Sequence, residues 1–293
     1  MGIDNANEEQ PGSSAIRVGV SGFSYDDWIG PVYPAGTKKG DMLAFYAQKL
    51  AFDMVELNYT YYTMPARKGT EGMLAHVGPA FSFVVKAHQS LTHNIRDEAG
   101  GFVRDEPSVE AFLEGLAPLI EGDRLICALA QFPMKFGKSV QGMEHIAWLA
   151  EKMRPVKLVV EFRNRAWAAQ SVFDFLRKIG VGYCVVDEPD LPSLMPFSPV
   201  ATSDIAYFRF HGRNKKWFGV TSAQRYNYLY SDLELRQFLM PIQKVARQAK
   251  TTLLFFNNHF QGQAVQNAMA MRALLGQENP RLDGIWLPRQ VDV

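Results

Sequence analysis

Short apolar segments alternate with amphipathic segments eight times along this chain. Typical apolar segments are RVGVSG, FSFVVK, KLVVEF and IAYFRF. Between them, apolar residues recur at helical spacing, as at Leu43, Tyr46, Ala47 and Leu50. Nearly continuous apolar strands separated by helices are typical of a parallel sheet with both faces covered. Eight such units predict an α/β fold, a single (β/α)8 barrel of the TIM type with its site at the carboxyl ends of the strands.

The expected elements can be placed along the chain by this periodicity. The strands are predicted at residues 17–22, 54–58, 81–86, 125–132, 157–162, 181–187, 205–210 and 252–256. The helices are predicted at residues 41–50, 67–77, 108–116, 140–153, 172–179, 231–246 and 263–275.

Local signals refine these boundaries. We expect Pro118 to end or kink the third helix, and Gly180 to form a left-handed cap. Ser231 and Glu234 form a capping box, and the proline-rich segment EPDLPSLMPFSP cannot be a long helix. Residues 1–15 are predicted to be a disordered polar tail, and residues 16–293 a single barrel domain.

Composition limits where the protein acts and what it binds. The formal net charge is +1, so no global field favours nucleic acid or an anionic membrane. The sequence contains no run of about 18 apolar residues, so no membrane span is predicted. The N-terminal stretch MGIDNANEEQPGSSA lacks the apolar core of a secretory signal. Cys127 and Cys184 lie in apolar stretches typical of buried thiols, so we expect a cytoplasmic protein.

Polar residues at the strand ends share one phase. If Glu56 points into the barrel, its neighbours Val55 and Leu57 face the helices, and the same alternation directs Glu161 and Arg209 inward. The polar ring predicted in this way comprises Ser21, Glu56, Asn58, Lys86, His88, Gln131, Glu161, Arg163, Asp187, Arg209, His211, Asn257 and Asn258. We expect a pocket lined by this ring.

Three members of the ring are the candidate catalytic residues. Glu56 and Glu161 suit an acid and base pair, and burial would raise the pKa of one of them. Alternatively, each carboxylate is the ion-pair partner of a nearby cation. His211 is the candidate for hydrogen bonding or proton transfer.

A metal site is a further alternative. Four histidines at or just past strand ends could join the acidic residues around a divalent ion, and these are His88, His93, His211 and His259. No tight ligand spacing such as HxH or HExxH occurs, so no metal ligands are assigned.

Two loops add aromatic and basic groups. Tyr25 and Trp28 in the first loop could stack on a sugar ring or a base. The segment HGRNKKWFGVTSAQRYNYLY, which contains Arg213, mixes basic and aromatic residues. That composition suits phosphate or single-stranded nucleic acid, but a lid over the pocket has the same composition and is the favoured interpretation.

Seven blocks of the sequence resemble one known family. In order they are GVSGFSYDDWIGPVYP, VELNYTYYTMP, FSFVVKAHQSLTH, QFP, VEFRNRAW, YFRFHGR and FFNNHFQGQAVQNA. Together they resemble the YecE-like family, a bacterial domain of unknown function, and the resemblance implies a TIM-type barrel. The family's recurrent polar positions match Ser21, Tyr25, Trp28, Glu56, Asn58, Tyr62, Lys86, Thr92, His93, Glu161, Arg163, Trp167, Arg209, His211, Arg213, Asn257 and Asn258. Phe23 and Met134 depart mildly from its pattern.

The resemblance implies no established reaction, substrate or cofactor, so three hypotheses about function stand. The first is an enzyme, hydrolase-like or isomerase-like, doing acid–base or hydrolytic chemistry on a small sugar or phosphate-bearing anion. On this hypothesis, Glu56→Gln and His211→Ala should abolish turnover with little effect on melting. The second is a metal-dependent nuclease or nucleic-acid repair barrel, and the third is a non-catalytic ligand-binding barrel. The predicted partner is a small-molecule substrate, with nucleic acid less favoured and no membrane.

Overall fold

Eight strands lie side by side in sequence order and close into a barrel. The computed structural model describes residues 15–280, and within that range β1 pairs with both β2 and β8, so the ring has no free edge. The strands are β1 (Ala15–Ser21), β2 (Met54–Leu57), β3 (Ser82–Lys86), β4 (Leu125–Gln131), β5 (Leu158–Glu161), β6 (Gly182–Asp187), β7 (Ile205–Phe210) and β8 (Thr251–Phe256). All pairs are parallel, and the predicted (β/α)8 barrel is confirmed.

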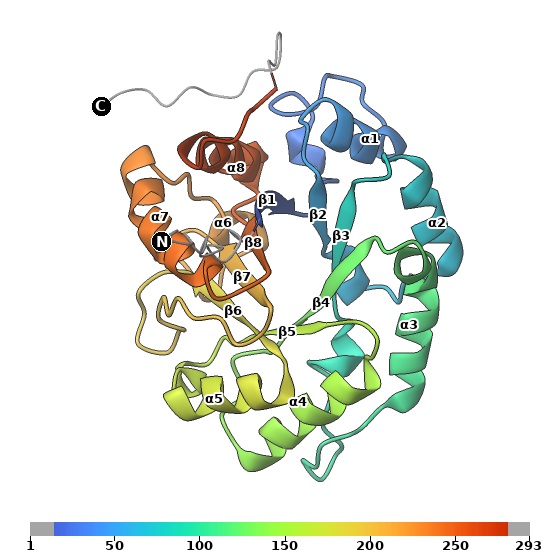
Figure 1. The fold of residues 1–293 in the computed structure, drawn as a ribbon, viewed down its shortest axis with the longest axis vertical. Helices are drawn as coiled ribbons and strands as arrows, with labels where there is room; N and C mark the ends of the chain where they lie inside the picture. Colours follow the sequence, from blue (N-terminus) through green and yellow to red (C-terminus); the bar gives the residue numbers. More distant parts are fainter. Residues whose placement is uncertain (1–14, 281–293) are drawn as a thin grey trace, which may run out of the picture.

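Helices surround the barrel as an outer ring (Figure 1). They are α1 (Met42–Gln48), α2 (Arg67–Ala75), α3 (Glu106–Glu121), α4 (Val140–Lys152), α5 (Gln170–Ile179), α6 (Ser222–Arg225), α7 (Asp232–Ala246) and α8 (Gln263–Leu274). Short 3-10 turns are η1 (Asp26–Trp28), η2 (Lys39–Asp41), η3 (Tyr59–Tyr61), η4 (Gln89–Leu91), η5 (Arg165–Trp167) and η6 (Phe260–Gly262). The proline-rich connection between β6 and β7 contains no helix, as expected.

The alternation of side chains along β7 explains how one strand serves two surfaces. Phe210 faces outward and packs against Phe238 of α7, with ring centroids 4.9 Å apart. Arg209 points into the barrel, where its guanidinium contacts side chains of other strands. Burial of each phenylalanine side chain contributes about 1.5–3 kcal/mol to folding. The apolar outer phase therefore holds the helices while the inner phase is available for polar groups.

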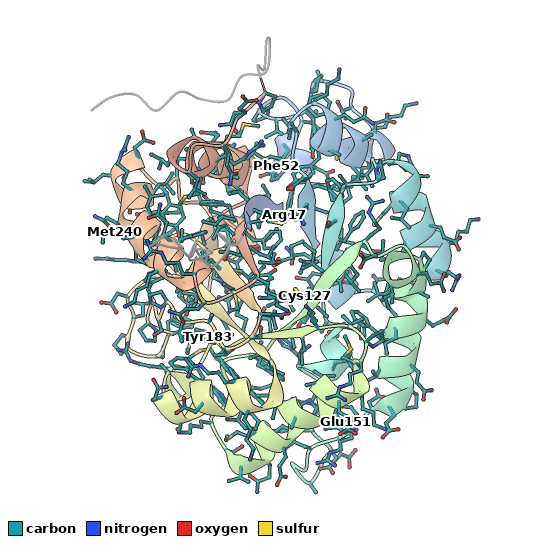
Figure 2. All side chains as sticks on the ribbon, viewed as in Figure 1. Arg17, Phe52, Cys127, Glu151, Tyr183 and Met240 are labelled. Carbon is teal, nitrogen blue, oxygen red and sulfur yellow. The ribbon has the colours of Figure 1, made fainter. Side chains whose placement is uncertain are left out.

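Both cysteines are buried in the core and have no disulfide partner, as the sequence predicted. Figure 2 shows Cys127 near the centre of the molecule and Met240 at its periphery. These positions agree with their exposed fractions of 0% and 80%. None of the helices in the described region is long and apolar enough to cross a membrane.

Two predicted helix ends are confirmed, and Pro118, which was expected to end or kink the third helix, does not have the first of these two effects. Gly180 caps α5 in the left-handed conformation with φ 69°, and Ser231 with Glu234 forms the capping box of α7. Pro118 does not end α3, which continues to Glu121. A proline removes only its own amide hydrogen bond, and Leu119 beyond it is fully buried and extends the apolar face of the helix. Burial of that face outweighs the lost bond.

The predicted tail at residues 1–15 lies outside the described residues, apart from Ala15, which begins β1.

Gly115 allows α3 to approach the start of α2 closely. A Cβ built on Gly115 of α3 would lie 2.1 Å from the carbonyl oxygen of Pro65, just before α2. Thr70 of α2 donates its hydroxyl to the carbonyl oxygen of Gly115 at 2.8 Å. Any side chain at position 115 must therefore separate the two helices.

We expect Gly115→Ala to lower the free energy of unfolding by about 1–3 kcal/mol, because the added methyl overpacks this contact. The control is Gly72→Ala in α2, where a Cβ would meet no atom within 4 Å. That variant should be more stable by about 0.5–1 kcal/mol, because alanine favours the helix. Urea unfolding measures both, and equal effects of the two substitutions would contradict this account.

Candidate functional site

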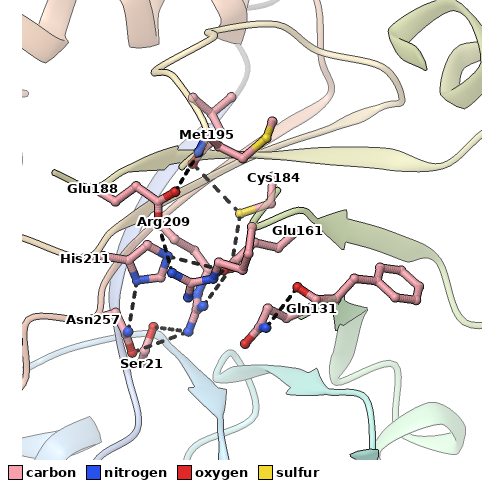
Figure 3. Close-up of polar contacts among 12 residues, drawn as sticks. Ser21, Gln131, Glu161, Cys184, Glu188, Met195, Arg209, His211 and Asn257 are labelled. Atoms are coloured by element: carbon pink, nitrogen blue, oxygen red, sulfur yellow. Dashed lines mark hydrogen bonds and ion pairs between the residues drawn. The ribbon is translucent and has the colours of Figure 1, made fainter. Parts of the chain in front are cut away.

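The side chain of Arg209 lies inside the barrel between two carboxylates. Its Nη2 atom is 2.6 Å from Oε1 of Glu56 on β2, and its Nη1 atom is 2.7 Å from Oε2 of Glu161 on β5. Glu56 and Glu161 have exposed fractions of 0%, and Arg209 of 2%. Figure 3 shows the guanidinium with Glu161, Ser21 and Asn257 around it. The inward phase predicted for these three strands is confirmed.

Each carboxylate has a second partner. Oε2 of Glu56 accepts a 2.5 Å hydrogen bond from the Tyr207 hydroxyl, and Oε1 of Glu161 is 2.7 Å from Nε of Arg163. Burial raises the pKa of Glu161, but Arg163 and Arg209 outweigh it and hold that pKa well below its usual range. Glu161 is therefore a charged ion-pair partner.

His211 follows β7 and is a neutral part of the same network. Its Nδ1 atom is 3.0 Å from Nδ2 of Asn257, and an amide nitrogen can only donate, so the imidazole proton lies on Nε2. That atom is 3.3 Å from Oε1 of Glu161. Burial, together with the charge of Arg163, lowers the pKa of His211 to about 3. The ring is therefore an uncharged imidazole whose Nε2 lies beside the Glu161 carboxylate.

A cavity of about 540 Å³ opens at the carboxyl ends of the strands. Its lining residues are Gly22, Phe23, Ser24, Tyr25, Leu57, Asn58, Tyr59, Tyr62, Lys86, Gln131, Arg163, Arg209, Ser222, Tyr226, Asn257 and His259. Within the described chain, Lys86, Arg163 and Arg209 are the charged members of this wall. Both buried carboxylates lie behind the guanidinium groups, so the cavity presents cations to a ligand.

Lys86, the last residue of β3, is unlike the two arginines. Its Nζ atom donates to Oε1 of Gln131 at 2.8 Å and lies 4.4 Å from the ring centroid of Tyr61. No carboxylate of residues 15–280 is within 4.0 Å of it. Burial and the nearby charge of Arg209 lower the pKa of Lys86 to about 7. Its amine is thus a group in the cavity that titrates near neutrality.

Arg163 connects the cavity to the buried acids. Nε contacts Glu161, and Nη1 lies 2.9 Å from Oε2 of Glu188. Burial raises the pKa of Glu188 to about 7, although Arg163 opposes this. Nη2 has no hydrogen-bond partner among the residues that the structure describes, so it is available to a ligand.

Six of the predicted binding residues line the cavity, and these are Tyr25, Asn58, Lys86, Arg163, Arg209 and Asn257. Ser21 is fully buried below the wall, with its hydroxyl 3.4 Å from Nη2 of Arg209. Of the three candidate catalytic residues, Glu56, Glu161 and His211, none lies on the wall.

Four other predicted binding residues lie away from the cavity wall, and the structure corrects their placement. Trp28 is fully buried and donates Nε1 to the carbonyl oxygen of His259 at 2.6 Å. Asn258 lies beyond the end of β8 and turns away from the cavity, where its Nδ2 donates to Oδ1 of Asn267 at 2.7 Å.

Arg213 and His93 complete the corrections. Arg213 forms hydrogen bonds from Nε and Nη2 to Asp187, the shortest 2.8 Å long, which hold it beside β6. His93 packs edge-on against Tyr61, and its Nδ1 lies 2.9 Å from the Thr92 hydroxyl. Burial, with a contribution from Lys86, lowers the pKa of His93 to about 4. These partners occupy the side chains that were expected to contact substrate.

Several wall residues come from loops that carried weak signals. Tyr226 belongs to the basic aromatic segment predicted as a lid, and His259 was considered as a metal ligand. Ser222, in the short helix α6, belongs to the same segment as Tyr226. In residues 15–280, no group of three or more His, Cys, Asp and Glu side chains could hold a metal ion. The metal alternative therefore lacks a ligand set in this part of the chain.

Comparisons with known proteins agree with the fold. The chain is 29% identical to UPF0759 protein YunF of Bacillus subtilis (strain 168), over 95% of this chain and 99% of that protein. It resembles the crystal structure of a DUF72 family protein from Thermotoga maritima MSB8, with 42% identity and a TM-score of 0.83, covering 89% of this chain and 99% of the other. A DUF72 family protein from Enterococcus faecalis V583 matches with 27% identity and a TM-score of 0.78, covering 95% and 100%.

The family model that matches residues 17–290 is described as "Protein of unknown function DUF72". Since this match spans most of the chain, the protein belongs to the DUF72 family.

Proposed function

We propose that the cavity binds a small polar anion and that the protein is an enzyme that transfers protons to or from this substrate. The observation that carries the proposal is the arrangement of charge in the cavity. The charged side chains of its described wall are Lys86, Arg163 and Arg209, and the carboxylates that balance the arginines are behind them. A carboxylate or phosphate group would complete the hydrogen bonding of these cations.

The location and size of the cavity support the same conclusion. Sites in (β/α)8 enzymes lie at the carboxyl ends of the strands. A volume of about 540 Å³ suits a molecule of metabolite size. Tyr25, Tyr59, Tyr62 and Tyr226 line the cavity beside the cations. Tyrosine rings suit the apolar faces of a sugar, so a sugar acid or sugar phosphate fits both parts.

We assign the proton transfer to Lys86 in place of Glu56, Glu161 and His211. A general acid–base group works best when its pKa lies near the operating pH, and it must reach the substrate. Lys86 lies on the cavity wall and has a pKa of about 7. Glu161 and His211 are buried below the wall, and their pKa values lie well below neutrality. Hydrolysis, with the Lys86 amine activating water, is one reaction of this class.

A ligand-binding barrel without catalysis is the second candidate. It is favoured by the ion pairs that hold both Glu56 and Glu161, which leave neither carboxylate available for chemistry. The titratable amine of Lys86 favours the enzyme over this alternative. We also propose that the protein is YecE-like, and this resemblance implies no particular reaction.

Arg163→Met should weaken binding of inorganic phosphate at least about tenfold, because one charge-assisted hydrogen bond contributes about 1.5–3 kcal/mol. Titration calorimetry at low ionic strength measures the affinity. Arg165→Met is the matched control, since Arg165 is exposed and lies outside the cavity wall. Equal phosphate affinity in both variants would overturn the assignment of the anion site.

The buried carboxylates are expected to act as supports of the site. Glu56→Gln removes one of the two anions around Arg209 and should lower the free energy of unfolding by about 3–5 kcal/mol. Glu121→Gln, which breaks the exposed 2.9 Å pair with Arg67, should cost no more than about 1 kcal/mol. Urea denaturation compares the two. Similar small losses would return Glu56 to the list of candidate catalytic groups.

Lys86 should make stability depend on pH above neutrality. Its pKa is about 7 in the folded protein and about 10.4 in an unfolded chain. Between these values the unfolded state binds more protons, so the free energy of unfolding rises with pH by up to about 1.4 kcal/mol per unit. Relative to that of Lys86→Met, the free energy of unfolding of wild type should therefore increase from pH 7 to pH 9. The difference between wild type and Lys135→Met, at an exposed position, should stay constant. Parallel curves for wild type and Lys86→Met would refute the shifted ionisation.

A further inference from the structure

The amine of Lys86 is the basis of an inference that rests on the proposed function and extends it. We propose that Lys86 is a nucleophile that forms an imine with its substrate, a small carbonyl compound that also carries a carboxylate or phosphate group. The substrate is thus an oxo acid or a phosphorylated aldehyde or ketone. Its anionic group would bind the guanidinium side of the cavity, and its carbonyl carbon would lie at Nζ.

The partners of Lys86 separate it from the lysines that form ion pairs. Lys39, Lys152 and Lys157 each have a carboxylate oxygen within 3.0 Å. Nζ of Lys86 instead contacts the neutral amide oxygen of Gln131 and the face of the Tyr61 ring. An ammonium group in a buried position without a counter-ion loses its proton readily. The neutral amine, with its lone pair, is the form that attacks a carbonyl carbon.

Gln131 fixes the direction of this amine. Nε2 of Gln131 donates to the backbone carbonyl oxygen of Phe132 at 3.2 Å, so Oε1 is the atom that faces Lys86. One N–H of the Lys86 amine is thereby bound at the end of β4. We infer that Gln131 is a positioning residue, because it holds the amine without supplying a negative charge.

The reaction balances within the cavity. The lone pair of Nζ forms a bond to the carbonyl carbon, and the π electrons of the carbonyl move to its oxygen. The two hydrogens of the amine then leave with that oxygen as water, the C–O bond breaks, and a C=N bond remains. Arg163 would stabilise the charge on the oxygen during addition. A proton taken up from solvent by the imine nitrogen gives a cation, which withdraws electrons from the adjacent carbon.

Imine formation specifies how Lys86 promotes proton transfer: its nitrogen activates the adjacent C–H bond of the bound substrate in place of exchanging the proton itself. An iminium acidifies the neighbouring C–H bond, so isomerisation or carbon–carbon cleavage next to the carbonyl becomes accessible. The positive charges of Arg163 and Arg209 disfavour the ammonium form of Lys86 and favour binding of the anionic end of the substrate. Both effects act in the same direction, because they keep the amine neutral and bring the carbonyl to it.

Pyridoxal 5′-phosphate with borohydride tests the inference, because this probe combines an aldehyde with a phosphate. At limiting probe and pH 7, Lys86 should form an imine that borohydride reduces to a stable adduct, at least roughly tenfold faster than any other lysine. The neutral fraction of an amine with pKa about 7 is about a thousandfold that of an ordinary lysine at this pH. Peptide mass spectrometry locates the adduct, and inorganic phosphate should slow the labelling.

Three variants make the test specific. Lys86→Met should lose the fast adduct, whereas Lys135→Met, which removes an exposed lysine beyond β4, should keep it. Gln131→Glu would place a carboxylate where Oε1 now lies 2.8 Å from Nζ. This counter-ion should move the pH profile of labelling upward by about one unit or more. A purely structural role for Gln131 would leave that profile unchanged.

The outcomes separate this inference from the proposed function. If phosphate binds in calorimetry but Lys86 is labelled no faster than the surface lysines, the imine is refuted and the anion site stands. If Lys86 is labelled selectively but phosphate neither binds nor competes, the nucleophile is supported and the anion site is refuted. An unchanged pH profile in a folded Gln131→Glu variant would overturn the role of the neutral amide.

Discussion

The interaction on which this structure depends is the pairing of Arg209 with Glu56 and Glu161 inside the barrel. A guanidinium so deeply buried requires a compensating charge, because transfer of an ion out of water costs several kcal/mol. Two strands that lie on opposite sides of β7 around the closed barrel, β2 and β5, supply that compensation. Their carboxylates then require further partners, which Tyr207 and Arg163 provide. One buried cation thus determines the inner side chains of several strands.

The same network explains why the carboxylates support the site and Lys86 is available for chemistry. Each acid contacts at least one guanidinium, and in the described chain neither lies within 4.0 Å of the amine at the end of β3. The charge of Arg209 also disfavours a second cation close by. Lys86 therefore lies in a cationic wall with a neutral amide as its hydrogen-bond partner. The electrostatics that stabilise the barrel interior and those that activate the amine have one origin.

Sequence reasoning identified the barrel and the inner phase of its strands because both follow from periodicity. Glu56, Glu161 and Arg209 were placed correctly, since every second residue of a strand faces one side. The rule does not extend beyond the strands. Trp28 and Arg213 are in connecting segments, and Asn258 lies beyond the end of β8. The chemical roles of these side chains could not be predicted from the sequence either. Gln131, the hydrogen-bond partner that leaves Lys86 without a counter-ion, is 45 residues away in the chain.

A lysine in this position is difficult to explain by stability alone. An apolar side chain of similar length would fill the space beside Tyr61 and Gln131 without a desolvation cost, and replacing buried charges by apolar groups often stabilises a protein. Burial lowers the pKa of Lys86 to about 7, so below that pH the folded state holds its ammonium at a cost. Groups that are retained at such a cost on the wall of a cavity concentrate at functional sites. The arginines are accounted for by their carboxylates. The amine is accounted for by a ligand that reacts with it.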